Sequence, residues 1–176
     1  ADGNFSWERF EERYVSELAD AFGNLASRVL AMLDRYRGGV VPSASEETPL
    51  DRFGDEALVR YAAAMDGLLL HRGAAAAWEL VAEANAFVER QAPWALAKRG
   101  DDAALDATLG ALARALLRLA VLAAPFMPAS ADALSAALGQ GDKLPLRGAW
   151  ERALAPVLAG AQTSRIPPLF PKPERV

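Results

Sequence analysis

The stretch Gln91-Ala92-Pro93-Trp94-Ala95-Leu96-Ala97-Lys98 lies at the middle of this 176-residue chain and divides its helical pattern in two. A long apolar helical pattern runs into it, and a second begins just beyond it. Pro93 has no backbone N–H to continue the first helix and restricts the dihedral angles of Ala92, so we expect the chain to turn here. The turn places Trp94 at a helix junction, where its ring can be held rigidly yet stay partly open.

The region nearest the N-terminus predicts two helices. Ser6 is a plausible N-cap, because acidic residues follow it in the first turns, and Ser16 could cap a second helix after a break near 14–16. The second helix carries apolar residues at alternating steps of four and three and ends at Gly38-Gly39. Its apolar stripe consists of Leu18, Phe22, Leu25, Val29, Met32 and Tyr36.

The segment 40–53 contains two prolines, serines and an acidic pair, which predicts a loop. Apolar residues at helical spacing then predict helices over 55–70 and 74–90, with Gly73 separating them. The stripe of the later helix leads directly into the Pro93-Trp94 junction. The first half of the chain therefore consists of helices joined by short connections.

Beyond the junction, Gly100-Asp101-Asp102 predicts a turn, followed by the most apolar helix of the chain, which is expected to be central. Its stripe consists of Leu105, Leu109, Leu112, Leu116, Leu119 and Ala123. Pro125 and Pro128 are expected to end it, and Ser130 or Asp132 could help to start a short helix reaching Leu138.

Regular structure is expected to thin out from Gly139, and the proline-rich segment 166–173 predicts an extended tail. We therefore expect an all-α antiparallel helix bundle over 1–138, with 139–176 as an irregular C-terminal extension packing on the same domain. Trp7, Trp78 and Trp150 are assigned to packing.

The composition excludes several classes of function. The net charge of −4 argues against broad binding to nucleic-acid backbones, which requires many Lys and Arg residues. The absence of cysteine removes disulfides and Cys-based metal sites, and is compatible with the reducing cytoplasm in which we expect the protein. His71 is the only histidine, and the glycines do not form a phosphate-binding loop. No apolar run is long enough to predict a membrane span.

Three sequence motifs indicate a more specific class of protein than a generic helix bundle. They are Leu18-Ala19-Asp20-Ala21-Phe22-Gly23-Asn24-Leu25-Ala26-Ser27-Arg28, the segment 85–98 that ends in Pro93-Trp94-Ala95-Leu96-Ala97-Lys98, and Pro125-Phe126-Met127-Pro128. Their order and spacing resemble the anticodon-binding domain of methionyl-tRNA synthetase, a class I aminoacyl-tRNA synthetase. Leu169-Phe170-Pro171-Lys172 resembles the ending of that domain, with Lys in place of Arg, and 2–6 resembles the segment that enters it.

The resemblance also implies what this chain lacks. Neither the His-Ile-Gly-His-like nor the Lys-Met-Ser-Lys-Ser-like ATP motif of the family occurs in the sequence. We therefore expect this chain to bind tRNA without catalysing aminoacylation, while ATP and methionine are used only by a catalytic domain outside it. The implied partners are the initiator and elongator methionine tRNAs and that catalytic domain.

The resemblance assigns recognition of the CAU anticodon to Asn24, Arg28 and Trp94, with Pro93 beside the ring. Asn24 and Arg28 are four residues apart, so they lie side by side on one helix. Their amide and guanidinium groups can read the edge of an unpaired base, and Trp94 can stack on one. Arg35 and Lys98 are candidates for contacts to tRNA phosphates, with Arg37 and Arg99 adding positive charge.

Each of these residues also has a structural interpretation. Trp94 could be a packing residue, and Arg28 could form a weak exposed ion pair with Asp20. Asn85, which also matches the family pattern, could make a buried hydrogen bond instead of contacting RNA. Two alternative functions remain: the equivalent domain of another class I synthetase, and a helical module that binds a protein partner.

Overall fold

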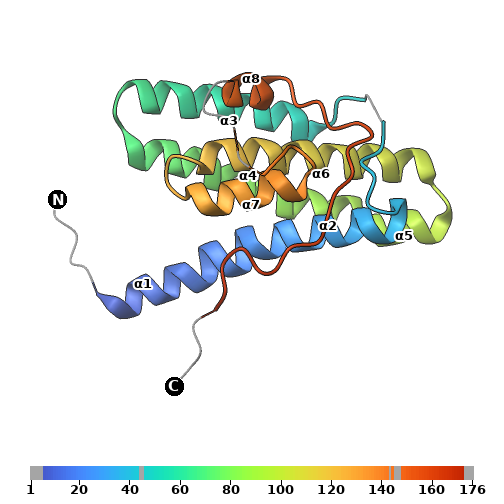
Figure 1. Ribbon diagram of the computed structural model, residues 1–176, viewed down its shortest axis with the longest axis horizontal. Coiled ribbons are helices and arrows are strands. Elements are labelled where there is room, and N and C mark those ends of the chain that lie inside the picture. Colours follow the sequence, from blue (N-terminus) through green and yellow to red (C-terminus); the bar gives the residue numbers. More distant parts are fainter. Residues whose placement is uncertain (1–5, 44–45, 143, 145–147, 173–176) are drawn as a thin grey trace.

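Helix α6 (Asp102–Ala123) forms the centre of the fold, and the other long helices pack around it (Figure 1). The computed structural model describes residues 6–43, 46–142, 144 and 148–172. Asp101 caps α6 by accepting a 3.3 Å hydrogen bond from the Ala104 N–H. Nearly all residues of α6 from Thr108 onward are buried, so the expectation of a central apolar helix is confirmed.

One continuous helical rod forms the N-terminal part of the fold, made of α1 (Trp7–Arg13), the π-helix η1 (Tyr14–Gly23) and α2 (Asn24–Arg37). The expected break at Ser16 is wrong, because the chain widens into a π-helix there without interrupting the rod. The Ser16 hydroxyl donates to the Glu12 carbonyl oxygen at 2.7 Å and caps no new helix. The predicted end at Gly38 is confirmed by its left-handed backbone, with φ of 60°.

Helices α3 (Pro49–Asp66) and α4 (Leu70–Gln91) pack along each other and differ from the predicted boundaries. Helix α3 begins inside the predicted loop, because Thr48 and Asp51 form a capping box and Pro49 occupies the first helical position. Gly73 lies within α4 and does not separate two helices. A Cβ there would lie 2.8 Å from the Met65 sulfur, so the glycine allows α3 and α4 to approach closely.

Three shorter helices complete the bundle: α5 (Pro93–Arg99), α7 (Pro128–Ala137) and α8 (Ala149–Leu154). Pro128 is the first residue of α7, and no side chain caps it; the Asp132 carboxylate accepts from the Leu144 N–H at 2.9 Å instead. Helix α8 is absent from the sequence-based expectation, because its six residues are too few for a periodic pattern to stand out.

The C-terminal segment runs back over α2 and along η1 (Figure 1). The Thr163 N–H donates to the Gly39 carbonyl at 2.7 Å, and the Phe170 ring packs against Phe22 with 5.7 Å between centroids. Lys172 pairs with Asp20 at 2.7 Å. Segment 2–6, which resembles the entry to the family's domain, lies outside the described residues apart from Ser6. Position 173 of the predicted tail also lies outside them.

The tryptophans assigned to packing have different environments. Trp78 is partly buried and meets Phe22 edge-on, and Trp150 stacks on Tyr61 with 6.1 Å between centroids. Trp7 does not fit the assignment: it is 71% exposed, because α1 extends beyond the bundle.

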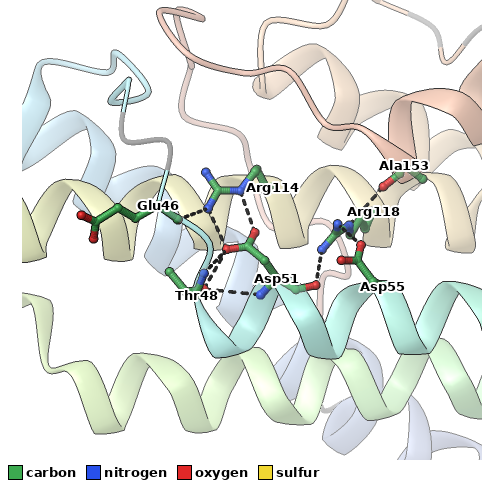
Figure 2. A network of polar contacts seen from close by, with 7 residues as sticks. All are labelled: Glu46, Thr48, Asp51, Asp55, Arg114, Arg118 and Ala153. Carbon is green, nitrogen blue, oxygen red and sulfur yellow. Dashed lines mark hydrogen bonds and ion pairs between the residues drawn. The ribbon is translucent and has the colours of Figure 1, made fainter.

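A buried polar network joins α3, α6 and α8 (Figure 2). The Asp51 carboxylate accepts two hydrogen bonds from Arg114, at 2.6 and 2.8 Å. Arg118 donates to the Asp55 carboxylate at 2.5 Å and to the carbonyl oxygens of Asp51 and Ala153 at 2.8 and 3.1 Å. Such a network stabilises the fold only while each buried charge keeps its partners.

Asp51 should make the unfolding free energy of the protein fall at acid pH. Its burial opposes ionisation, but hydrogen bonds from Arg114 and Thr48 outweigh burial and lower the pKa of Asp51 below the ordinary 3.8. Its contribution is therefore fully present above the unfolded pKa and is lost as the pH falls through the lower folded pKa. We expect the difference in unfolding free energy between wild type and Asp51→Asn to shrink below about pH 4. Urea titrations at several pH values measure this difference, with the exposed Asp66→Asn as control; a pH-independent difference would contradict it.

Candidate functional site

The Pro93 junction holds the Trp94 ring at the surface. Helix α4 ends at Gln91, and Ala92 adopts a left-handed conformation with φ of 45° and ψ of 65°. Its carbonyl oxygen accepts from the N–H groups of Ala95 and Leu96, at 2.7 and 3.2 Å, so α5 starts directly at Pro93. Pro93 is buried and Trp94 is 45% exposed. The predicted turn is confirmed, and the ring is open to solvent on one side.

A shallow pocket of about 310 Å³ lies between Trp94 and the outer face of α2. Its lining on α2 comes from residues spaced three or four apart, which share one face of the helix. Those residues are Arg28, Ala31, Met32, Arg35 and Tyr36. The structure therefore brings Trp94 and Arg28, which lie far apart in the sequence, to one surface site.

Arg28 is held at this site by an acidic residue on α4. Its Nη2 donates to Glu89 Oε1 at 2.7 Å, and both side chains are partly exposed, at 41% and 62%. The alternative pairing with Asp20 is wrong, because Asp20 interacts with Lys172 of the C-terminal segment. Glu89 thus orients the Arg28 guanidinium from a neighbouring helix.

Asn24 lies one turn before Arg28, at the start of α2, and does not line the pocket. Its amide Nδ2 donates to Asp20 Oδ1 at 3.4 Å, and the residue is exposed. Asn85 is engaged within the protein: its Nδ2 donates to the carbonyl oxygens of Val81 and Ala21, at 3.0 and 3.2 Å. Asn85 therefore ties α4 to η1.

The candidate phosphate contacts have different positions. Arg35 lines the pocket, and its guanidinium carbon lies 5.5 Å from the centroid of the Tyr36 ring, within cation–π range. Lys98 is exposed one turn after Trp94 and lies outside the pocket lining. Arg37 is engaged with Asp102 and Asp106 on α6.

Three residues of the site were missed by the sequence-based assignment: Met32, Tyr36 and Glu89. Met32 and Tyr36 were placed in the apolar stripe of α2, yet both are only partly buried and line the pocket. A signal for them existed, because Arg28, Met32 and Tyr36 succeed one another at steps of four. The pairing of Glu89 with Arg28 is a contact between helices that spacing cannot predict.

The arrangement is suited to holding an unpaired nucleobase. An exposed indole, a phenol and a methionine offer apolar and aromatic surface, and two arginines offer planar hydrogen-bond donors. Proteins read single-stranded RNA loops by stacking bases on aromatic rings and contacting their edges. Within the described parts of the chain, no group of acidic or histidine side chains could hold a metal ion.

Known proteins resemble this chain in both sequence and fold. The family model described as the anticodon-binding domain of methionyl tRNA ligase matches residues 38–174. A methionine–tRNA ligase from Streptomyces coelicolor is 38% identical over 148 residues, covering 78% of this chain and 27% of the relative. Methionine–tRNA ligase 1 from Bacillus anthracis is 29% identical over 180 residues, covering 99% of this chain and 27% of the relative.

A solved structure shares the whole fold. The apo form of Mycobacterium tuberculosis methionyl-tRNA synthetase superposes with a TM-score of 0.89 at 28% identity, covering 100% of this chain and 36% of that chain. The fold and the family match thus define a helical anticodon-binding domain of the class I aminoacyl-tRNA synthetases. Within that class, the chain belongs to the methionyl-tRNA ligase family.

The chain spans about a quarter of the length of the curated relatives it matches. Helices α1, η1 and α2 all precede the residues that the family model matches, whereas Trp94 lies within them. Among the described residues, no helix is both long and apolar enough to cross a membrane.

Proposed function

We propose that this chain binds the anticodon loop of methionine tRNAs and recognises the CAU anticodon, so that the acceptor end can be aminoacylated by a catalytic domain. Its RNA partners would be the initiator and elongator methionine tRNAs. ATP and methionine would be used by the catalytic domain, and this chain would need no cofactor to bind tRNA. The reaction would take place in the cytoplasm. The observation that carries this proposal is the pocket that joins Trp94 to Arg28 across two helices.

Within the pocket, the residues have distinct roles. Trp94 stacks on a splayed anticodon base, and Tyr36 offers a second ring on the opposite wall. The Arg28 guanidinium donates to acceptor atoms on a base edge, and Asn24 contributes its amide from one turn away. Arg35 and Lys98 contact loop phosphates, which supplies local positive charge in an acidic chain.

The acidic neighbour of Arg28 gives this proposal a testable consequence. Replacing Glu89 with Gln removes a negative charge that repels the RNA backbone and releases Arg28 from its ion pair. We expect tRNA affinity to rise, whereas the unfolding free energy should change by less than about 1 kcal/mol, because the pair is exposed. Filter binding and thermal unfolding measure both quantities, with Glu79→Gln on the same helix as control. A fall in affinity would contradict this expectation, because the orientation that Glu89 gives to Arg28 would then outweigh the repulsion between Glu89 and the RNA backbone.

The proposal is tested by titrating this chain with an RNA stem–loop that carries the CAU anticodon. Chemical shifts of the tryptophan indole N–H groups detect even weak binding by a single domain. We expect the Trp94 signal to move with the CAU loop and to move less at the same concentration of a loop with an altered anticodon. Equal responses to both loops, or a stronger response to the altered anticodon, would contradict recognition of CAU.

A further inference from the structure

Arg37, the last residue of α2, joins that helix to the beginning of α6. Its Nε donates to the Asp106 carboxylate in a short hydrogen bond, and its Nη2 donates to Asp102 Oδ1 at 2.8 Å. A third donor, Nη1, lies 2.8 Å from the carbonyl oxygen of Tyr36. The Arg37 guanidinium therefore binds two carboxylates on one helix and a backbone group on the other.

The environment of Arg37 supports a fixed geometry. Its side chain is only 23% exposed, and that of Asp106 is 36% exposed, whereas Asp102 is mostly in solvent. Burial alone would lower the pKa of Arg37, but the bonds to Asp106 and Asp102 outweigh burial and raise it. Contacts from one planar guanidinium to two carboxylates on the same helix restrict both distance and orientation.

This contact joins the helix that carries one pocket wall to the helix that follows the other wall. Tyr36 and Arg35, immediately before Arg37, belong to the α2 wall. The other wall is Trp94 on α5, which ends at Arg99, three residues before α6 begins. The Asp101 N–H donates to the Leu96 carbonyl at 3.1 Å, which fixes α5 to the start of α6. Any shift of α2 relative to the start of α6 would therefore change the spacing between Tyr36 and Trp94.

We propose that Arg37, through Asp106 and Asp102, is a positioning residue that sets the spacing between the Tyr36 wall and the Trp94 wall of the pocket. The inference rests on the proposed function, because the pocket is taken to hold an anticodon base. Arg37 does not line the pocket and is held by carboxylates, so it acts through Tyr36 and Trp94 and not as a phosphate contact. Arg37 would thus position the pocket walls, whereas its charge alone suggested that it attracts tRNA phosphates.

The test compares Arg37→Ala, Asp106→Asn and the double variant with wild type. Each single variant should weaken binding of the CAU stem–loop by about three- to tenfold, because small misplacements of binding groups are costly. The loss for a loop altered at its first anticodon base should be smaller, so discrimination falls. The double variant should be little worse than either single variant, since both changes break one contact. Arg37→Lys, which keeps the charge but not the planar fork, should restore part of the affinity.

Two controls separate positioning from loss of stability. Arg165→Ala removes two hydrogen bonds to Asp34, which lies on α2, like Arg37, but does not line the pocket. This variant should leave discrimination between the loops unchanged. In protein labelled with 5-fluorotryptophan, the fluorine signal of Trp94 should shift in Arg37→Ala and stay in place in Arg165→Ala. If a variant unfolds, the milder Asp102→Asn is used in its place.

The outcomes distinguish the two proposals. If wild type discriminates between loops and the Arg37 and Asp106 variants discriminate equally well, positioning by Arg37 is overturned while the proposed function stands. If wild type does not discriminate, the proposed function fails, and the Trp94 fluorine signal alone decides whether Arg37 positions the ring. An unmoved signal overturns the positioning role in that case as well.

Discussion

Replacing Trp94 with alanine should weaken binding of the CAU stem–loop by about 1–3 kcal/mol, the usual contribution of a base stacked on an aromatic ring. The ring is 45% exposed and forms one wall of the pocket, so its removal deletes the stacking surface without opening the core. The unfolding free energy should therefore change little. Filter binding and urea denaturation of the same preparations measure the two quantities.

The matched control is Trp7→Ala. Trp7 is 71% exposed on α1 and does not line the pocket, so its removal should leave affinity for the loop unchanged. Equal affinities for wild type and Trp94→Ala would return Trp94 to a structural role. A large loss of stability in Trp94→Ala would point the same way.

Replacing Arg118 with alanine should lower the unfolding free energy by about 3–5 kcal/mol, since it removes a buried cation and leaves the Asp55 carboxylate and two backbone carbonyl oxygens without this donor. The Arg118 side chain is 4% exposed and donates to Asp55 and to two backbone carbonyl oxygens (Figure 2). Those carbonyls belong to Asp51 on α3 and Ala153 on α8, so the change affects three elements at once. Urea denaturation monitored by circular dichroism measures the loss.

Two further variants, Arg60→Ala and Gly54→Ala, test whether the stability loss in Arg118→Ala comes from the buried network. Arg60→Ala removes a partly exposed arginine between α3 and α4 and should cost about 1 kcal/mol or less. Gly54→Ala should also be destabilising, because a Cβ at Gly54 would overlap the Arg118 guanidinium. A loss for Arg118→Ala no larger than that for Arg60→Ala would contradict the structural role of the network.

Periodicity predicted the helices that pack by a long apolar stripe. The central position of α6 and the end of α2 at Gly38 followed from residue spacing and glycine chemistry. The π-helix could not be predicted in this way, because ten residues at π-helical spacing leave no sequence feature separable from an α-helix. The start of α3 could have been predicted, since Thr48 and Asp51 form a capping box and Pro49 occupies the first helical position. The surrounding prolines and serines instead favoured a loop.

The candidate site was predictable only in part. The proline beside Trp94 predicted a helix junction at which the ring could be either open or packed, and the pairing of Trp94 with Arg28 came from resemblance to a family. The contribution of Tyr36 depended on which side of the α2 stripe faces the bundle, which is set by α4 and α6 and not by α2 itself. Glu89 and Arg37 act through contacts between helices far apart in sequence, so no local pattern reveals them.

The most direct test of the account is the ratio of affinities for two stem–loops, one with CAU and one with its first base replaced. It should be measured for wild type, Arg28→Ala and Trp94→Ala. We expect wild type to prefer CAU by about tenfold or more, and both variants to lose most of that preference while remaining folded. If the variants kept the wild-type ratio, the pocket between Trp94 and α2 would not be the site that reads the anticodon.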